Sequence, residues 1–167
     1  MLFDDSNPLF HRCLDPYRSK GAIYLRSCEI DTATMESQGQ FSIAESCYID
    51  DTGHFNAAEF VMCYNQLMYM SLCAGVFHKA HPFENWSMED FWERQLPHVL
   101  IQQLDSRYTR PINARNFSGK FVIDEVDFSR RERGIVKLHT SVEFSDATGG
   151  RARGKVLLAL TNIPATT

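Results

Sequence analysis

The chain lacks an excess of basic residues. Its 167 residues include 17 Lys and Arg against 21 Asp and Glu, which gives a formal net charge of −4 at pH 7. Nucleic-acid binding depends on a basic surface that neutralises phosphates, so we predict no nucleic-acid partner. Hydrophobic residues make up 44% of the chain and charged residues 23%, which argues against disorder. We predict a single packed domain over residues 1–167.

Motifs for paired or metal-bound cysteines are also lacking. The chain has five cysteines, an odd number, and no Cys-x-x-Cys spacing. Two of them, Cys63 and Cys73, lie in an apolar segment, so we predict reduced, buried thiols in a cytoplasmic protein. The first residues include two aspartates where a secretory signal would be basic. His78 and His81 have no cluster of cysteines or carboxylates beside them, and we predict no metal site.

The segment that begins at Asn56 contains no Gly or Pro up to Cys73. After Glu59 it also contains no charged residue before His78, and this pattern predicts a long helix that is buried on nearly all sides. Asn56 suits the N-cap, and Glu59 occupies the capping-box position three residues later. The apolar length approaches that of a membrane span. The polar residues Asn65, Gln66 and Ser71 favour the core helix of a soluble domain instead.

The remaining elements are predicted from their apolar patterns and turn signals. A short helix or turn is expected at 8–16, and a second helix from Ser87 to about Leu104, kinked at Pro97. Extended segments are expected at 22–36, 38–49, 117–128, 135–144 and 151–163, with turns at 130–134 and 146–150. This order predicts an α+β fold of the hot-dog type, an antiparallel sheet curled around one long helix. Sheet edges need cover, so a homo-oligomer is expected.

Several motifs together resemble a known family. They are Leu14-Asp15-Pro16-Tyr17, Lys20-Gly21, Phe41-Ser-Ile-Ala-Glu-Ser-Cys-Tyr-Ile49, Thr52-Gly-His-Phe-Asn56, Asn65-Gln-Leu67, Ser106-Arg107, Arg110-Pro111 and Ala159-Leu-Thr-Asn-Ile-Pro164. This combination is similar to the FcoT-type hot-dog thioesterases and covers about residues 10–164.

The resemblance implies an activity and a set of catalytic residues. Members act on fatty acyl-CoA thioesters. Close relatives in isonitrile biosynthesis add glycine to the β-carbon of a (2E)-enoyl group on an acyl carrier protein and then hydrolyse the thioester. The family's two tyrosines and asparagine correspond to Tyr17, Tyr48 and Asn56 here. The implied partners are acyl carrier protein or acyl-CoA and glycine. No cofactor is implied beyond the phosphopantetheine that carries the acyl group.

Further candidates follow from the chemistry. Both reactions place negative charge on the thioester oxygen, which donors at the start of a helix can stabilise. Glu59 is the candidate base for the glycine ammonium group, with Glu45 a weaker one. His54 and Gln66 are expected to contact the substrate, Gln66 because it shares a helical face with Asn56 and Glu59. Lys20 and Arg107 are candidates for the glycine carboxylate.

Arg107 also belongs to a basic set that suits a phosphate or an acidic carrier protein, consisting of Arg107, Arg110, Arg115 and Lys120.

Three other functions stay open. A simple acyl-CoA or acyl-carrier-protein thioesterase would lack glycine in its product, and a non-catalytic acyl-thioester-binding protein would show no turnover. A hot-dog dehydratase is the third, because Gly53-His54-Phe55 resembles the Gly-His-Phe-Pro motif of that class. Asn56 replaces the proline, and Asn65 and Gln66 lie where the dehydratase acid is expected, which weakens this alternative.

Overall fold

The computed structural model describes residues 1–164. Its strands and helices follow the order β1 (Leu2–Asp4), α1 (Pro8–Arg18), β2 (Leu25–Asp31), β3 (Glu36–Phe41), α2 (Ala57–Phe77), α3 (Met88–Arg94), β4 (Val99–Arg110), β5 (Phe117–Asp127), the short 3₁₀ helix η1 (Arg131–Arg133), β6 (Val136–Ser145) and β7 (Arg151–Leu160).

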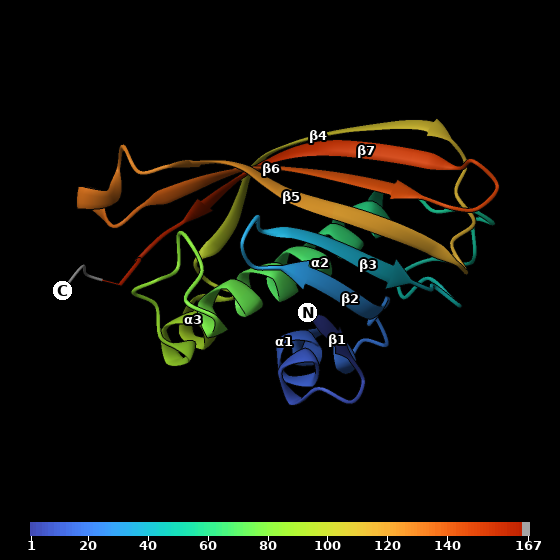
Figure 1. The fold of residues 1–167 in the computed structure, drawn as a ribbon. Coiled ribbons are helices and arrows are strands. Elements are labelled where there is room, and N and C mark those ends of the chain that lie inside the picture. The colour runs from blue at the N-terminus through green and yellow to red at the C-terminus, as the bar shows by residue number, and fades with distance from the viewer. Residues whose placement is uncertain (165–167) are drawn as a thin grey trace.

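The strands form one antiparallel sheet in the order β1-β2-β3-β5-β6-β7-β4. The sheet curls around α2, and α1 packs against the same helix near the N-terminal strands (Figure 1). An antiparallel sheet wrapped around one long helix is the hot-dog architecture that the sequence predicts. β4 follows α2 and α3 in the chain. It pairs with β7 and forms the sheet edge opposite β1.

Helix α2 is the core of the fold. It begins at the N-cap Asn56 with the capping box predicted from Glu59, and 15 of its residues are buried. Its length and apolar composition would suit a membrane span, but 78% of its most apolar 18-residue window is buried inside the protein. The sheet and α1 therefore take the place that lipid would occupy.

Alternate residues of the central strands face α2 and pack against it to form the core. In β6 every second residue from Val136 to Phe144 is buried. Phe144 packs edge-on against Phe60 of α2, with ring centroids 5.1 Å apart. Gly119 in β5 leaves the space for this ring, because a Cβ there would lie 2.6 Å from Phe144. Large aromatic side chains and small strand residues thus complement each other.

Two predicted elements extend too far toward the C-terminus. The helix after Ser87 begins as expected with a capping box to Asp90, but it ends at Arg94, and residues 99–110 form β4 instead of continuing the helix to Leu104. Pro97 disfavours helix at the residue before it. The apolar residues that follow pair with β7, where long-range contacts decide the conformation.

The extended segment predicted at 38–49 ends early, because β3 stops at Phe41. Residues 42–56 form a loop that leaves the sheet. Its first residues bond elsewhere: the Ser42 N–H donates to the Tyr24 carbonyl oxygen at 3.0 Å and the Ile43 N–H donates to the Ala114 carbonyl oxygen at 2.8 Å. Tyr48 consequently lies in a loop and does not end a strand.

Candidate active site

Asn56 joins the loop to α2, and its side-chain oxygen is fully engaged. Its Oδ1 atom accepts hydrogen bonds from the backbone N–H of Ala58 at 3.0 Å and of Glu59 at 3.1 Å, as an N-cap should. It accepts a third from the Tyr48 hydroxyl at 2.6 Å. Three donors on Oδ1 fix which end of the amide is oxygen. The Nδ2 group, which has no partner within residues 1–164, therefore remains a free donor at the start of the helix.

Tyr48 supports Asn56. The residue is 48% exposed, and its hydroxyl hydrogen is committed to Asn56 Oδ1. The resemblance implies a catalytic role for this phenol. The structure instead gives it the position of a brace that holds the Asn56 amide in one orientation. Tyr48 and Asn56 are brought together as the resemblance implied.

Glu59 is only 2% exposed, and both of its carboxylate oxygens accept hydrogen bonds. The Asn56 N–H donates to Oε2 at 3.1 Å, and the Ser46 hydroxyl donates to Oε1. The predicted capping box is therefore confirmed. A buried carboxylate with both oxygens hydrogen-bonded is poorly placed to accept a proton from substrate. This position does not favour the role of base predicted for Glu59. Glu45 is exposed in the loop.

Sequence reasoning missed Ser46 and Tyr24. Ser46 reaches Glu59 from thirteen residues away, and the Cys47 N–H donates to the Tyr24 hydroxyl oxygen at 3.3 Å. Burial is the largest cause that raises the pKa of Tyr24 above its usual value, so this phenol stays protonated. No local spacing signals these contacts, because they depend on how the loop folds back over the helix.

Gln66 lies near the middle of α2 and is completely buried. Its Oε1 atom accepts from the backbone N–H of Tyr24 and of Leu25, each at 2.9 Å, and its Nε2 donates to the Ala22 carbonyl oxygen at 2.6 Å. The amide holds the chain at the start of β2. Because Gln66 is completely buried, direct contact with substrate, as predicted from the sequence, would require this part of the core to open.

Tyr17 lies on α1 and packs partly buried against the core. Burial raises the pKa of its hydroxyl, with smaller contributions from Tyr69, Cys13 and Cys63. Two of these neighbours, Tyr69 and Cys63, belong to α2. Lys20 follows α1 and is exposed to solvent. The structure therefore does not bring Tyr17 or Lys20 into hydrogen-bonding contact with the Tyr48–Asn56 pair.

An open pocket of about 390 Å³ lies beside Asn56, lined by His54, Phe55, Asn56, Ala57, Tyr108, Thr109, Arg110, Pro111 and Ile112. Phe55 and Ile112 are buried and give the pocket an apolar floor. The Phe55 N–H donates to the Ile112 carbonyl oxygen at 3.1 Å and ties the loop to the segment after β4. His54 and Asn56 thus line one cavity.

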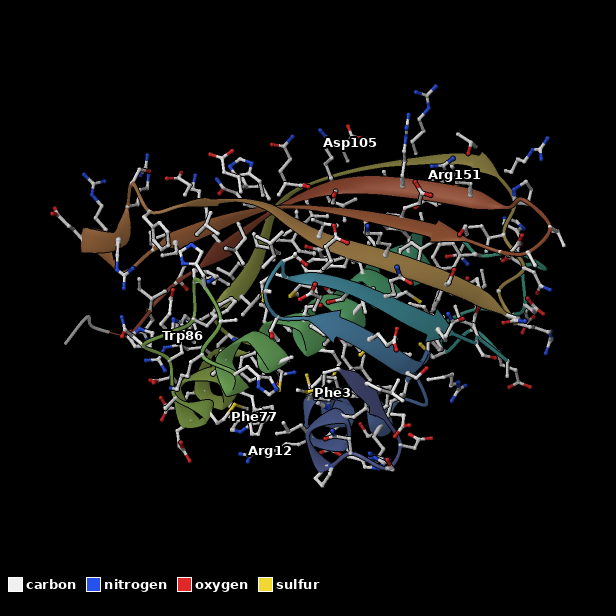
Figure 2. All side chains as sticks on the ribbon, in the orientation of Figure 1. Phe3, Arg12, Phe77, Trp86, Asp105 and Arg151 are labelled. Carbon is white, nitrogen blue, oxygen red and sulfur yellow. The ribbon has the colours of Figure 1, made fainter. Side chains whose placement is uncertain are left out.

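Of the four basic residues predicted to act together, Arg107 and Lys120 line one groove, whereas Arg110 lines the pocket beside Asn56 and Arg115 lines neither. Arg107 lines a groove on the outer face of the sheet together with Lys120 and Asp105. Figure 2 shows Asp105 and Arg151 on this face, directed away from α2. Arg107 therefore lies across the sheet from Asn56, which does not favour it as the ligand for a glycine carboxylate at that residue. Arg115 pairs with Asp51 at 3.3 Å and Lys120 with Glu36 at 2.8 Å.

Neither nucleophilic catalysis by a cysteine nor catalysis by a bound metal ion is supported by residues 1–164. Burial raises the pKa of the Cys63 thiol well above its ordinary value, which opposes formation of a thiolate nucleophile. In the part of the chain that the structure describes, no group of three His, Cys, Asp or Glu side chains lies close enough to hold a metal ion.

Comparisons with known proteins show the family. Residues 12–160 match the family model described as FcoT-like thioesterase domain. A (2E)-enoyl-[ACP] glycyltransferase from Mycobacterium marinum is 38% identical over 159 residues, covering 93% of this chain and 86% of the relative. One from Streptomyces coeruleorubidus is 38% identical over 161 residues, covering 93% of this chain and 97% of the relative.

Solved structures support the fold. Thioesterase superfamily member 2 from Mus musculus superposes with a TM-score of 0.57 at 11% identity, covering 91% of this chain and 92% of that chain. A mutant thioesterase from Pseudomonas aeruginosa gives a TM-score of 0.56 at 8% identity, covering 91% and 93%. The fold and the sequence match over most of the chain lead to one assignment: the chain belongs to the FcoT-like thioesterase domain family.

Proposed function

We propose that this protein adds glycine to the β-carbon of a (2E)-enoyl-[acyl-carrier-protein] thioester and then hydrolyses the thioester to release a 3-(carboxymethylamino) acid, in a pathway to isonitrile natural products. The names of its relatives support the first step, and its thioesterase domain suits the second. The observation that carries the proposal is the free Nδ2 donor of Asn56 at the start of α2, beside an open pocket.

The same donors serve both steps. Addition of an amine to the β-carbon shifts electrons to the thioester oxygen and forms an enolate. Hydrolysis forms a tetrahedral oxyanion at the same oxygen. A fixed amide donor, aided by the partial positive charge of the helix start, stabilises either species more than the neutral thioester. One site can therefore catalyse both reactions while the acyl group stays in place.

Isotopically labelled glycine tests the proposal directly. With a (2E)-enoyl-acyl carrier protein as substrate, we expect mass spectrometry to detect a released 3-(carboxymethylamino) acid that carries the label. A simple thioesterase, the alternative suggested by the domain, would release the unsubstituted acid at a rate independent of glycine. That second result would refute the glycine addition.

We also propose the partners and the location. The acyl group arrives on the phosphopantetheine arm of acyl carrier protein, with acyl-CoA as the alternative carrier, and no other cofactor takes part. The cytoplasm suits this chemistry, and all five cysteines are free thiols, four of them buried. Free thiols are usual where the environment is reducing.

A second copy of the chain is proposed to cover the β4 edge. Ile101 and Tyr108 pair with buried residues of β7, so they lie on the inner face of the sheet, yet they are 37% and 42% exposed. On α2, Val61 and Met62 are also only partly buried. A long edge strand with exposed apolar side chains normally pairs or is covered.

Sedimentation of the purified protein tests this assembly. We expect a mass of at least twice the 19.2 kDa of one chain. Ile101→Glu should shift the protein toward the monomer, because it places a charge on the inner face at this edge. Leu100→Glu, on the outer face next to it, is the matched control and should leave the mass unchanged. A wild-type monomer at micromolar concentration would contradict the assembly.

A further inference from the structure

We propose that His54 is the base that removes a proton from the glycine ammonium group, and that the pocket beside Asn56 is the glycine site. This inference rests on the proposed function. Glycine is charged at both ends near neutral pH, and its nitrogen becomes a nucleophile only after it loses a proton. The site therefore needs a proton acceptor that the bound amine can reach.

The contacts of His54 fix the position of its proton. Its Nδ1 atom lies 3.0 Å from the carbonyl oxygen of Thr52. Because a carbonyl oxygen only accepts hydrogen bonds, Nδ1 must carry a hydrogen. In the neutral imidazole the lone pair is then on Nε2, which has no hydrogen-bond partner within residues 1–164. An imidazole held in this tautomer presents an open proton acceptor.

The loop holds His54 from both sides. The Thr52 hydroxyl donates to the His54 carbonyl oxygen at 2.9 Å, and the Gly53 N–H donates to Asp51 Oδ1 at 2.8 Å. Gly53 has a φ of +76°, a left-handed conformation that glycine adopts without a steric penalty. On the other side Phe55 is buried, with its ring 4.8 Å from that of Phe117. The exposed imidazole is thus anchored between a hydrogen-bonded turn and the core.

The pocket suits a small amino acid. It joins His54 to the Asn56 amide over an apolar floor, and Arg110 lies on its wall. The Arg110 guanidinium takes part in no ion pair among residues 1–164. A free cation there favours an approaching carboxylate. Glu59 does not compete for the base role, because both of its oxygens are occupied beneath Asn56.

The proposed step conserves protons and electrons. His54 Nε2 takes one proton from the glycine ammonium, and the freed amine nitrogen forms a bond to the β-carbon. The π bond between the α- and β-carbons breaks, and its electrons move to the thioester oxygen, where Asn56 Nδ2 donates. The proton on His54 then passes to the α-carbon as the carbonyl re-forms. The product is a secondary ammonium, still attached through the thioester.

The substitution His54→Asn tests this step. The asparagine amide can replace the Nδ1 donor to Thr52 but provides no group in place of Nε2. With labelled glycine and a (2E)-enoyl-acyl carrier protein, we expect the yield of labelled acid to fall about 100-fold, the low end for loss of a general base. Hydrolysis of a saturated acyl-acyl carrier protein should change less than about threefold, since that reaction uses Asn56 and no glycine. The released product should shift toward unsubstituted enoic acid.

The outcomes separate this inference from the proposed function. A purely structural effect of His54→Asn would lower addition and hydrolysis together and would overturn the inference. So would an unchanged yield of labelled acid, or a larger loss of addition in Glu59→Gln than in His54→Asn while both remain folded. His139→Asn, on the exposed outer face of β6, is the matched control and should leave both rates unchanged. If the wild-type protein gives no labelled acid, the proposed function itself fails.

Discussion

Asn56→Asp should lower turnover by roughly 100-fold while the free energy of unfolding changes by less than about 0.5 kcal/mol. The aspartate keeps an oxygen where Oδ1 accepts from Ala58, Glu59 and Tyr48, so the helix cap survives. Asp and Asn are equally good N-caps. The substitution removes the Nδ2 donor and places a negative charge where negative charge develops in the reaction. Loss of one such donor typically costs two to three orders of magnitude in rate.

Two companion variants complete this test, with steady-state hydrolysis and denaturant unfolding measured on each. Asn56→Ala should lose a similar amount of turnover and also about 1 kcal/mol of stability, because the cap is gone. Tyr48→Phe should lose less activity than either, since it removes only the brace on the Asn56 amide. If Asn56→Asp keeps full turnover, the amide is not the donor.

Gln66→Leu should destabilise the protein by roughly 3 kcal/mol or more. Leucine has a similar volume but leaves two backbone N–H groups and one carbonyl oxygen, of Tyr24, Leu25 and Ala22, without partners in a buried region. Each unsatisfied buried group costs about 1–3 kcal/mol. Typical domains are stable by only about 5–15 kcal/mol, so the fraction of folded protein should fall visibly. Chemical denaturation with two optical probes measures the change.

A matched control and an activity assay complete the Gln66 experiment. Gln103→Leu, at an exposed position on the outer face of β4, should change stability by less than about 0.5 kcal/mol. The fraction of Gln66→Leu that remains folded should turn over at close to the wild-type rate. Reduced turnover in a protein of wild-type stability would instead support the substrate contact predicted from the sequence.

The start of α2 could be predicted because its signals are local. Asn56 and Glu59 lie three residues apart, and the capping box needs nothing beyond that spacing. The absence of charge after Glu59 likewise marked the helix as the core. The hairpin turn at 146–150 was predictable for the same reason, since the Asp146 carboxylate bonds to the backbone N–H groups of Thr148 and Gly150 within it.

The contacts that distant segments make could not be predicted. Nothing in the sequence from Val99 to Arg110 indicates that β7 lies beside it, and so residues 99–104, the first half of β4, were assigned to a helix. Residues 42–49, the first part of the loop, were assigned to a strand because their hydrogen bonds to Tyr24 and Ala114 cannot be inferred from local patterns. The same limitation explains why Glu59 was predicted as a base, since burial and the Ser46 hydroxyl take its oxygens out of reach.

The three hydrogen bonds accepted by Asn56 Oδ1 restrict which amino acids position 56 can hold. Serine, threonine and aspartate can all begin a helix, but none of them offers an N–H on the opposite end of the same group. Glutamine has the amide but is one methylene too long to cap with its oxygen. A saturation library selected for folding alone should therefore accept several residues at this position, whereas selection for turnover should recover asparagine alone. Comparing the two selections would reveal how far folding and catalysis depend on one side chain.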